Sequence, residues 1–269
     1  DGIGAVGGYK AIVNANVGHV YDIVSNKYTV VRHEEVVDAV RTALAEYNIE
    51  PESFRIEFSG RYDARLFVKT LWDEKIVGGD SIILGMIVTN SYDRSMGISA
   101  SGFGLRMGCM NEMVFGREIA FEYTMHTKNV KDRVVEIIPK VLDRLERIVE
   151  VIELSMNELV SLADVASLIR ALGLSKKMQE RLFGLIAKYV DPETARLLRQ
   201  EIVAMEEAER AEILARLERL QEYEAPRWQT YNAFTELLTH YAGRNDAYTV
   251  YSWQKRVANE LLAPVAVKV

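Results

Sequence analysis

The sequence is short of several features whose absence narrows the classes of protein it can represent. It has a single cysteine, Cys109, so no disulfide can form within the chain, and the apolar neighbours of Cys109 indicate a buried, inert thiol. No apolar run approaches the roughly 20 residues that a membrane-spanning helix needs. The first residues, Asp1 to Gly4, lack the basic and apolar segments of a signal peptide. From these features we expect a cytoplasmic protein that does not enter a membrane.

The chain also lacks an excess of positive charge. Its 269 residues carry a formal net charge of −6. Residues 1–150 hold 18 Lys and Arg against 22 Asp and Glu, and residues 151–269 hold 15 against 17. This balance argues against a protein that grips duplex DNA mainly by neutralising its phosphates, but it is compatible with a local basic groove.

The motifs of common enzymes are missing as well. None of the four histidines has a second metal-type ligand at a suitable local spacing, which argues against a zinc or iron site. There is no phosphate-binding loop, no nucleophile elbow and no HExxH motif. A nucleophilic pair of Cys109 with a distant histidine is the alternative to a core thiol, and the core thiol is favoured. We expect no catalytic residue, no metal and no cofactor.

What the sequence does have is strand-like patterning in its first half. Ile82 to Thr89 is a nearly continuous apolar run, typical of a strand buried on both faces. Met96 to Ala100 alternates after a polar turn, which predicts a hairpin. Phe54 to Phe58 also alternates, and Arg61 to Trp72 returns as its partner strand.

Beyond Asn129 the hydrophobic period becomes helical. Apolar residues from Val134 to Leu154 mark a long amphipathic helix, in which Pro139 predicts a kink or a break. Glu201 to Glu224 is a dense run of Glu, Arg, Ala and Leu, which predicts another helix with i,i+4 charge pairs.

These patterns predict an α+β fold. We expect a hairpin-rich antiparallel sheet with helices in the N-terminal half, followed by an all-helical C-terminal half. The corresponding domains are an α+β sheet domain over residues 1–132 and a helical region over residues 133–269 that packs on it. With 49% hydrophobic residues, the chain is able to bury a substantial core.

Three motifs give the chain a family resemblance. They are Y-x-V-V-x-H-x-E-V at Tyr28 to Val36, T-N-S-x-D and F-G-x-R-M-x-C-x-N between Thr89 and Asn111, and H-T-x-N-V at His126 to Val130. Over roughly Gly8 to Leu262 the chain resembles the phage- and plasmid-borne family known as domain of unknown function 932. This resemblance implies a fold and a mobile-element setting. In element order the chain is also similar to the single-strand annealing proteins of phage recombination systems, which implies rings that hold single-stranded DNA in a basic groove.

The leading hypothesis is therefore a non-enzymatic, homo-oligomeric protein that binds single-stranded nucleic acid and anneals DNA. Cations would neutralise phosphates, and aromatic rings would stack on bases. We place the contacts on two hairpins, with Arg61, Tyr62, Arg65 and Lys69 on the first and Tyr92, Arg94 and Arg106 on the second. For Arg65 and Lys69, an ordinary solvated face is an equal alternative.

A further contact is expected where strand patterning gives way to helix at His126 and Thr127. Either Thr127 or Asn129 can cap the helix, and this is the favoured role of the segment. Lys128 and Lys131 flank the same helix start and would bind a phosphate as a secondary role.

Two other classes of function remain open. Seven aromatic residues between Trp228 and Trp253 suit a self-assembling or partner-docking protein without nucleic-acid affinity, although core packing is the simpler interpretation. The third class is an enzyme that acts on nucleic acid through a dispersed active site.

Overall fold

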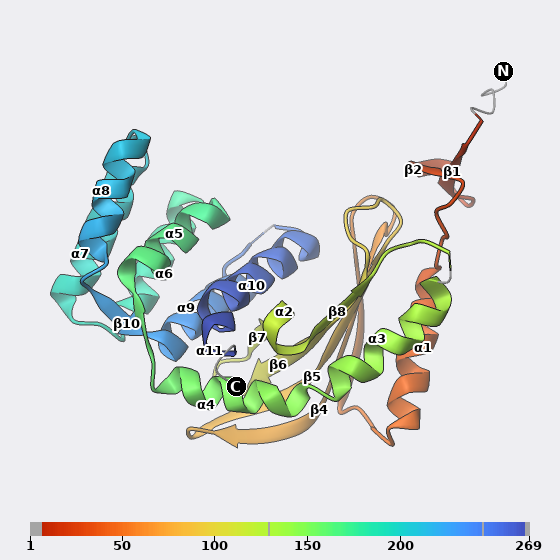
Figure 1. Ribbon diagram of the computed structural model, residues 1–269, viewed down its shortest axis with the longest axis horizontal. Helices are drawn as coiled ribbons and strands as arrows, with labels where there is room; N and C mark the ends of the chain where they lie inside the picture. Colours follow the sequence, from red (N-terminus) through yellow and green to blue (C-terminus); the bar gives the residue numbers. More distant parts are fainter. Residues whose placement is uncertain (1–6, 129, 244, 267–269) are drawn as a thin grey trace.

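The computed structural model describes residues 7–128, 130–243 and 245–266. Within them, one antiparallel sheet organises the molecule (Figure 1). Its strands are β3 (Ser53–Ser59), β4 (Arg65–Val77), β5 (Asp80–Ser91), β6 (Ile98–Arg106), β7 (Asn111–Val114) and β8 (Phe121–Thr124). They pair in the order β3-β4-β5-β6-β7, and β8 pairs with the first half of β6 while β7 pairs with its second half. The predicted hairpin of Ile82–Thr89 with Met96–Ala100 is therefore confirmed as β5 and β6.

Helices cover both faces of this sheet (Figure 1). They are α1 (His33–Glu46), α2 (Arg117–Ala120), α3 (Val130–Leu142), α4 (Leu145–Met156), α5 (Leu162–Leu172), α6 (Lys176–Ile186), α7 (Pro192–Met205), α8 (Arg210–Leu220), α9 (Arg227–His240), α10 (Ala247–Leu261) and α11 (Ala263–Ala266). Figure 1 shows α1, α3 and α4 along one side of the sheet and α9 and α10 on the other, with α5 to α8 at one end. No helix in the described ranges is long and apolar enough to cross a membrane.

Alternate residues of each strand face opposite helical layers, as the two-residue period of a strand requires. On β4, Leu66 and Val68 belong to the core that contains residues of α1, α3 and α4. Phe67 and Leu71 point the other way and pack with Tyr251 of α10. Burial on both faces explains why β5 is an almost unbroken apolar run.

The predicted division of the chain, with an all-helical second half, is wrong. Strand β9 (Leu159–Ser161) pairs with β10 (Glu224–Pro226) inside the half expected to be helical. Helices are not confined to that half: α1 precedes the sheet and α2 lies between β7 and β8, within the half where the sequence predicts helices beside the sheet. The β9–β10 pair joins the chain entering α5 to the chain leaving α8. Strands of three residues leave too little alternation to be recognised in a sequence. The domain boundary at residue 132 falls inside α3, and the two-domain division stays a prediction.

Two long helical runs expected from the sequence are each divided in two, and the first division confirms the kink or break that Pro139 predicts. The helix expected over Val134–Leu154 is divided at Asp143–Arg144, one turn after Pro139, into α3 and α4. The charged run from Glu201 is divided between α7 and α8. The expected i,i+4 pairing does occur in α8, where Arg216 bonds Glu212 at 2.6 Å.

A separate hairpin of β1 (Tyr9–Asn14) and β2 (His19–Ser25) projects from the body beyond the end of the sheet (Figure 1). It exposes a set of large apolar side chains, namely Tyr9, Val13, Val17, Val20 and Ile23. An isolated two-stranded hairpin is only marginally stable in water. Its attachment to the main sheet forms the first part of the site described next.

Candidate nucleic-acid interface

The aromatic side chains of four segments meet where the β1–β2 hairpin joins the main sheet: β2, the start of α1, β3 with its following turn, and the β5–β6 turn. We call the group formed by His19, Tyr21, His33, Phe58, Tyr62 and Tyr92 the aromatic cluster. Its ring centroids form a chain of contacts: His19 to Tyr62 at 4.7 Å, Tyr21 to Tyr92 at 5.3 Å, Tyr92 to His33 at 3.9 Å and His33 to Phe58 at 5.8 Å. Most of these rings line an open cavity of about 450 Å3.

The turns that carry the aromatic cluster have an unusual backbone. Five described residues other than glycine have a positive φ, and three of them lie here: Tyr62 at 53°, Asp63 at 58° and Arg94 at 55°. A side chain with a Cβ adopts this region at a cost, and such strain concentrates at functional sites. Tyr21 holds the first turn by donating its hydroxyl hydrogen to the Tyr62 carbonyl oxygen at 2.5 Å.

Two arginines accompany the aromatic cluster. The Arg61 guanidinium lies over the Tyr62 ring, 5.1 Å from its centroid. Arg94 is 55% exposed and bonds both carboxylate oxygens of Asp22, which ties the β5–β6 turn to the hairpin. Arg61 therefore presents a cationic group beside a stackable ring, whereas the charge of Arg94 is shared with a carboxylate.

A buried network of hydrogen bonds around His33 holds the aromatic cluster in place. The Asn90 side-chain amide lies 3.1 Å from Nδ1 of His33, and Nε2 of His33 lies 3.1 Å from the Asp63 carbonyl oxygen. Nδ1 accordingly accepts and Nε2 donates, the pattern of a neutral imidazole. Burial lowers the pKa of His33, in agreement with that neutral state. The Tyr92 hydroxyl accepts the backbone N–H of His33 at 2.7 Å, so residues from two of the sequence motifs fix one another.

The third motif joins the same region through His126. Its ring stacks on Tyr28 with centroids 4.9 Å apart, and its Nδ1 lies 3.2 Å from the Thr29 carbonyl oxygen. Burial raises the pKa of Tyr28 to about 12, and the charges of Arg94, Asp22 and Asp93 also act on this phenol.

The helix start after His126 is only partly described. The Val130 N–H donates to the Thr127 carbonyl oxygen at 3.0 Å. Lys128 is exposed. Asn129 and the Lys131 side chain lie outside the described residues, so the predicted cap and phosphate contact stay predictions.

Three predicted contacts lie apart from the aromatic cluster and are occupied by carboxylates. Lys69 is 13% exposed and bonds Glu57 at 2.9 Å and Glu112 at 2.8 Å, in a cavity of about 430 Å3 between the sheet and α9–α10. Arg106 bonds Asp80 at 2.6 Å at the opposite end of the sheet.

Arg65 is the third of these cations. It bonds Asp93 at 2.8 Å, and its guanidinium lies 4.7 Å from the centroid of Tyr248. It also lies 3.7 Å from Asp246, the N-cap of α10. Arg65 therefore fastens the start of α10 to the β5–β6 turn.

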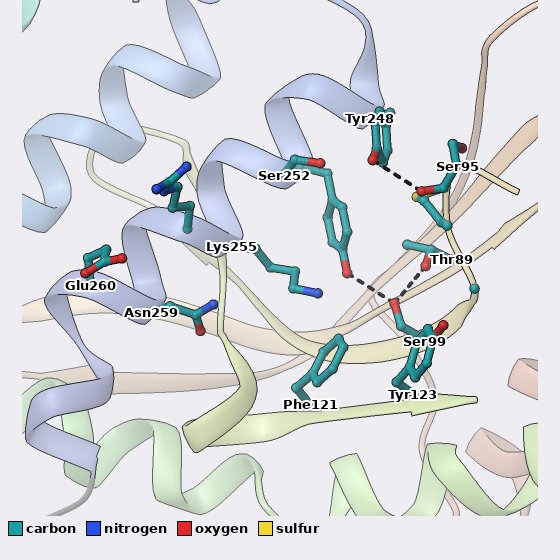
Figure 2. A pocket seen from close by; sticks show the side chains of 14 residues that line it. Thr89, Ser95, Ser99, Phe121, Tyr123, Tyr248, Ser252, Lys255, Asn259 and Glu260 are labelled. Atoms are coloured by element: carbon teal, nitrogen blue, oxygen red, sulfur yellow. Dashed lines mark hydrogen bonds between the residues drawn. The ribbon is translucent and has the colours of Figure 1, made fainter. Parts of the chain in front are cut away.

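A groove beneath α10, which we call the α10 groove, lies on the other side of this turn (Figure 2). Its volume is about 460 Å3. The sheet provides Thr89, Ser99, Phe121 and Tyr123, and α10 provides Tyr248, Ser252, Lys255 and Asn259. Figure 2 shows the Lys255 amine reaching from α10 toward Phe121, whose ring centroid is 3.9 Å away.

Sequence reasoning identified part of this arrangement. It selected Arg61, Tyr62, Tyr92 and Arg94, which the fold brings together, but not His19 or Tyr21, whose hairpin carries no local sign of its position. It also missed the α10 groove, because Tyr123 and Lys255 come from segments about 130 residues apart. The aromatic residues of α9 mainly form core, with Trp228, Tyr231 and Phe234 all buried.

The described part of the chain contains no group of three or more His, Cys, Asp or Glu side chains able to hold a metal ion. Comparison with protein families gives one match, to the model described as Domain of unknown function (DUF932), over residues 20–259. Neither the curated proteins nor the solved structures include a significant match.

Proposed function

Because the chain belongs to the domain of unknown function 932 family, whose description specifies no activity, we propose a function from its own residues: it binds single-stranded nucleic acid. The aromatic cluster contacts the bases, and Arg61, Arg94 and Lys128 contact the phosphates. The resemblance stated above adds the setting of a phage, plasmid or archaeal mobile element, annealing of complementary strands as the reaction, and the cytoplasm as its location.

The observation that carries this proposal is the aromatic cluster itself. Six rings from four segments form a chain in which neighbours lie within stacking distance, and one of them, Tyr62, has a strained backbone with a positive φ. Stacking of a base on an aromatic side chain is worth about 1–3 kcal/mol and accepts any sequence. The base faces of a duplex are already stacked, so this surface favours a single strand.

The charges near the aromatic cluster set the expected salt dependence. Each phosphate contact with a single strand contributes about −0.7 to the slope of log K against log salt concentration. Three cations would give a slope of about −2, and the Arg94–Asp22 ion pair makes this an upper bound. A shallow slope combined with measurable affinity is the signature of binding dominated by stacking.

The test compares two variants that make the same kind of change at equivalent backbone positions. Tyr62→Asn removes a ring from the aromatic cluster, and asparagine tolerates the positive φ of 53°. Met110→Asn is the matched control, since Met110 has a φ of 55° and lies on the β6–β7 turn at the opposite end of the sheet. Fluorescence anisotropy with a labelled oligothymidylate, at several salt concentrations, measures affinity and slope.

We expect Tyr62→Asn to weaken binding roughly 5- to 150-fold, the equivalent of about 1–3 kcal/mol, and Met110→Asn to leave it unchanged. Equal affinity of the two variants would show that the aromatic cluster does not contact the strand. Absence of any binding by the unaltered protein at low salt would refute the function and favour the docking alternative.

Self-association forms part of the proposal and is supported by the β1–β2 hairpin. Its exposed apolar side chains and its projection from the body suit contact with a second copy of the chain. Contact between two different surfaces of identical copies produces rings or filaments. Light scattering with Ile23→Asp, which places a charge at a residue that is 60% exposed, tests this point. If the unaltered protein is monomeric both with and without oligonucleotide, self-association is refuted.

A further inference from the structure

The open cavity beside the aromatic cluster, which we call the α1 cavity, has an aromatic side and an acidic side. Phe58 and Tyr62 line it and are 49% and 44% exposed, so their rings are open to a ligand. Its volume of about 450 Å3 lies within the range of about 300–1,000 Å3 that is typical of small-molecule sites. A flat aromatic ligand would therefore find both room and ring faces to stack on.

The charged side chains that line the α1 cavity are mostly acidic. They are Glu34, Asp38, Arg41 and Asp63. Asp38 lies 3.8 Å from Arg41, so these two charges offset each other. The carboxylates of Glu34 and Asp63 accept no hydrogen bond and form no ion pair with any residue that the structure describes. The cavity therefore contains two carboxylates whose hydrogen-bonding capacity is open to a ligand.

Both free carboxylates belong to residues beside His33. Glu34 follows His33 in the first turn of α1, and the Asp63 carbonyl oxygen lies 3.1 Å from Nε2 of the His33 ring. The charges of both carboxylates also act on that ring. Tyr92 stacks on the same ring, with the centroids 3.9 Å apart. The free acceptors therefore lie next to the stacked rings, where the edge of a stacked base would be.

The neutral polar groups of the α1 cavity already have partners within the protein. The Asn14 amide donates to the Tyr21 hydroxyl at 3.0 Å, and this hydroxyl donates to the Tyr62 carbonyl oxygen. The Tyr92 hydroxyl accepts the backbone N–H of His33. These groups hold the walls of the cavity in place, so the two free carboxylates determine which ligand fits.

The cations near the α1 cavity lie outside its lining. Arg61 lies over the Tyr62 ring, and Arg32 bonds Glu35, but neither arginine lines the cavity. A phosphate inside the cavity would meet two free carboxylates, whereas a phosphate outside it could reach Arg61. The part of a nucleotide that enters the cavity is therefore the base.

Carboxylates select among the bases by the donors on each Watson–Crick edge, which is exposed in an unpaired strand. Guanine presents two adjacent donors, its N1–H and its 2-amino group, which match the two oxygens of a carboxylate. Adenine and cytosine present one amino group beside a ring-nitrogen acceptor, and thymine presents one N–H between two carbonyl oxygens. Hydrogen bonds to an ionised acceptor are roughly twice as strong as neutral ones, and an acceptor that faces a carboxylate is repelled. Guanine therefore suits this cavity best.

We propose that the α1 cavity binds one guanine base of the strand. The N1–H and the 2-amino group donate to the carboxylates of Glu34 and Asp63. The guanine ring stacks on the exposed rings of Phe58 and Tyr62. This inference rests on the proposed nucleic-acid-binding function, and it adds a base preference at one position of a surface that otherwise accepts any sequence.

The experiment measures the affinity of the full chain for four labelled dodecathymidylates that differ at one central position. That position holds thymine, adenine, guanine or hypoxanthine, which is guanine without its 2-amino group. The adenine strand controls for the stronger stacking of a purine. Glu34→Gln and Asp63→Asn each remove one charge with little change of size, and asparagine tolerates the φ of 58° at Asp63. Glu46→Gln, at the exposed last residue of α1, is the matched control.

We expect the guanine strand to bind roughly 5- to 150-fold more tightly than the adenine strand, the discrimination that one bidentate pair provides. The hypoxanthine strand should fall between them. Glu34→Gln and Asp63→Asn should each reduce the preference for guanine, the double variant should abolish it, and Glu46→Gln should keep it. Equal affinity for guanine and adenine strands would overturn the proposal, as would a preference that survives in the double variant.

Free guanosine is the additional probe that separates this proposal from the proposed function. If Tyr62→Asn weakens strand binding but guanine gives no preference, the function stands and the guanine site is refuted. If no strand binds but guanosine binds and the Glu34→Gln/Asp63→Asn variant abolishes this binding, the guanine site stands and the function is refuted. If neither the strands nor guanosine bind the unaltered protein, both are refuted.

Discussion

The hydroxyl network under α10 predicts that a double substitution is more stable than one of its single substitutions. The Tyr251 hydroxyl lies 3.2 Å from that of Ser99 and 3.3 Å from that of Ser101, in the buried layer between α10 and the sheet. Ser99 has a second partner, the Thr89 hydroxyl at 2.8 Å. Ser101 is fully buried, and Tyr251 is its side-chain partner in this network. Tyr251→Phe therefore leaves Ser99 satisfied but Ser101 unpaired.

The cost of Tyr251→Phe follows from this inequality. An unpaired buried hydroxyl costs about 1–3 kcal/mol, whereas removing both partners of a hydrogen bond can be nearly neutral. We expect Tyr251→Phe to lower the free energy of unfolding by about 2 kcal/mol. Adding Ser101→Ala should restore about 1 kcal/mol of it, so that the double variant is more stable than the single one.

Urea unfolding of the two single variants, the double variant and the unaltered protein measures this cycle. The m-values should agree, which would show that the same surface is exposed in each case. Ser99→Ala in place of Ser101→Ala is the control, because it also removes the partner of Thr89 and should give no such recovery. Losses that simply add in the Tyr251→Phe/Ser101→Ala variant would refute the assignment of Tyr251 as the partner of Ser101.

Two further predictions concern the strands and the buried histidines. A Cβ at Gly85 would lie 1.8 Å from the Thr70 carbonyl oxygen, next to the register shift between Leu71 and Asp73. Gly85→Ala should therefore lower the free energy of unfolding by about 3 kcal/mol or more and lower Tm by at least about 6 °C. A Cβ at Gly108 would meet nothing within 4 Å, so Gly108→Ala is the control and should change the free energy of unfolding by less than about 0.5 kcal/mol. Equal melting temperatures of the Gly85→Ala and Gly108→Ala variants would contradict the close approach at Gly85. Burial lowers the pKa of both His33 and His126 in the folded protein. The stability that they contribute is therefore fully present above their unfolded pKa of about 6.5, and it is lost as the pH falls from there through their folded pKa values. Urea unfolding between pH 7.5 and 5 measures this loss, and NMR titration in which all four histidines have ordinary pKa values would refute it.

The elements that the sequence predicts well are those whose pattern is both local and long. β5 is almost unbroken in its apolar character because α1 and α10 cover its two faces. The short pair β9–β10 could not be predicted, since it depends on bringing together segments about 60 residues apart. The break between α7 and α8 also depends on tertiary packing, which overrides a continuous helical period. The break between α3 and α4, in contrast, follows Pro139, where the sequence predicts a kink or a break.

The candidate site shows a similar division. Tyr62, Tyr92 and Arg94 lie on turns that the sequence marks, and the fold gathers them. Residues on the same strand face could not be sorted by partner. Arg65 and Lys69 lie on the same face of β4 and carry the same positive charge. Arg65 nevertheless fastens α10 to a turn, whereas Lys69 lies between two glutamates. The carboxylates that decide these roles come from other strands, so the alternation of β4 alone could not reveal them.

The acidic balance of the chain bears directly on how it would hold nucleic acid. Lys69, Arg65 and Arg106 each bond an acidic side chain of the same molecule, so three of the predicted contacts have their charge neutralised within the fold. Arg61, in contrast, lies over the Tyr62 ring, and Arg94 shares its charge with Asp22. Affinity built in this way depends more on base stacking than on phosphate neutralisation. Because only an unpaired strand exposes its base faces, an acidic protein of this design would discriminate single strands from duplex by the same contacts that provide its affinity.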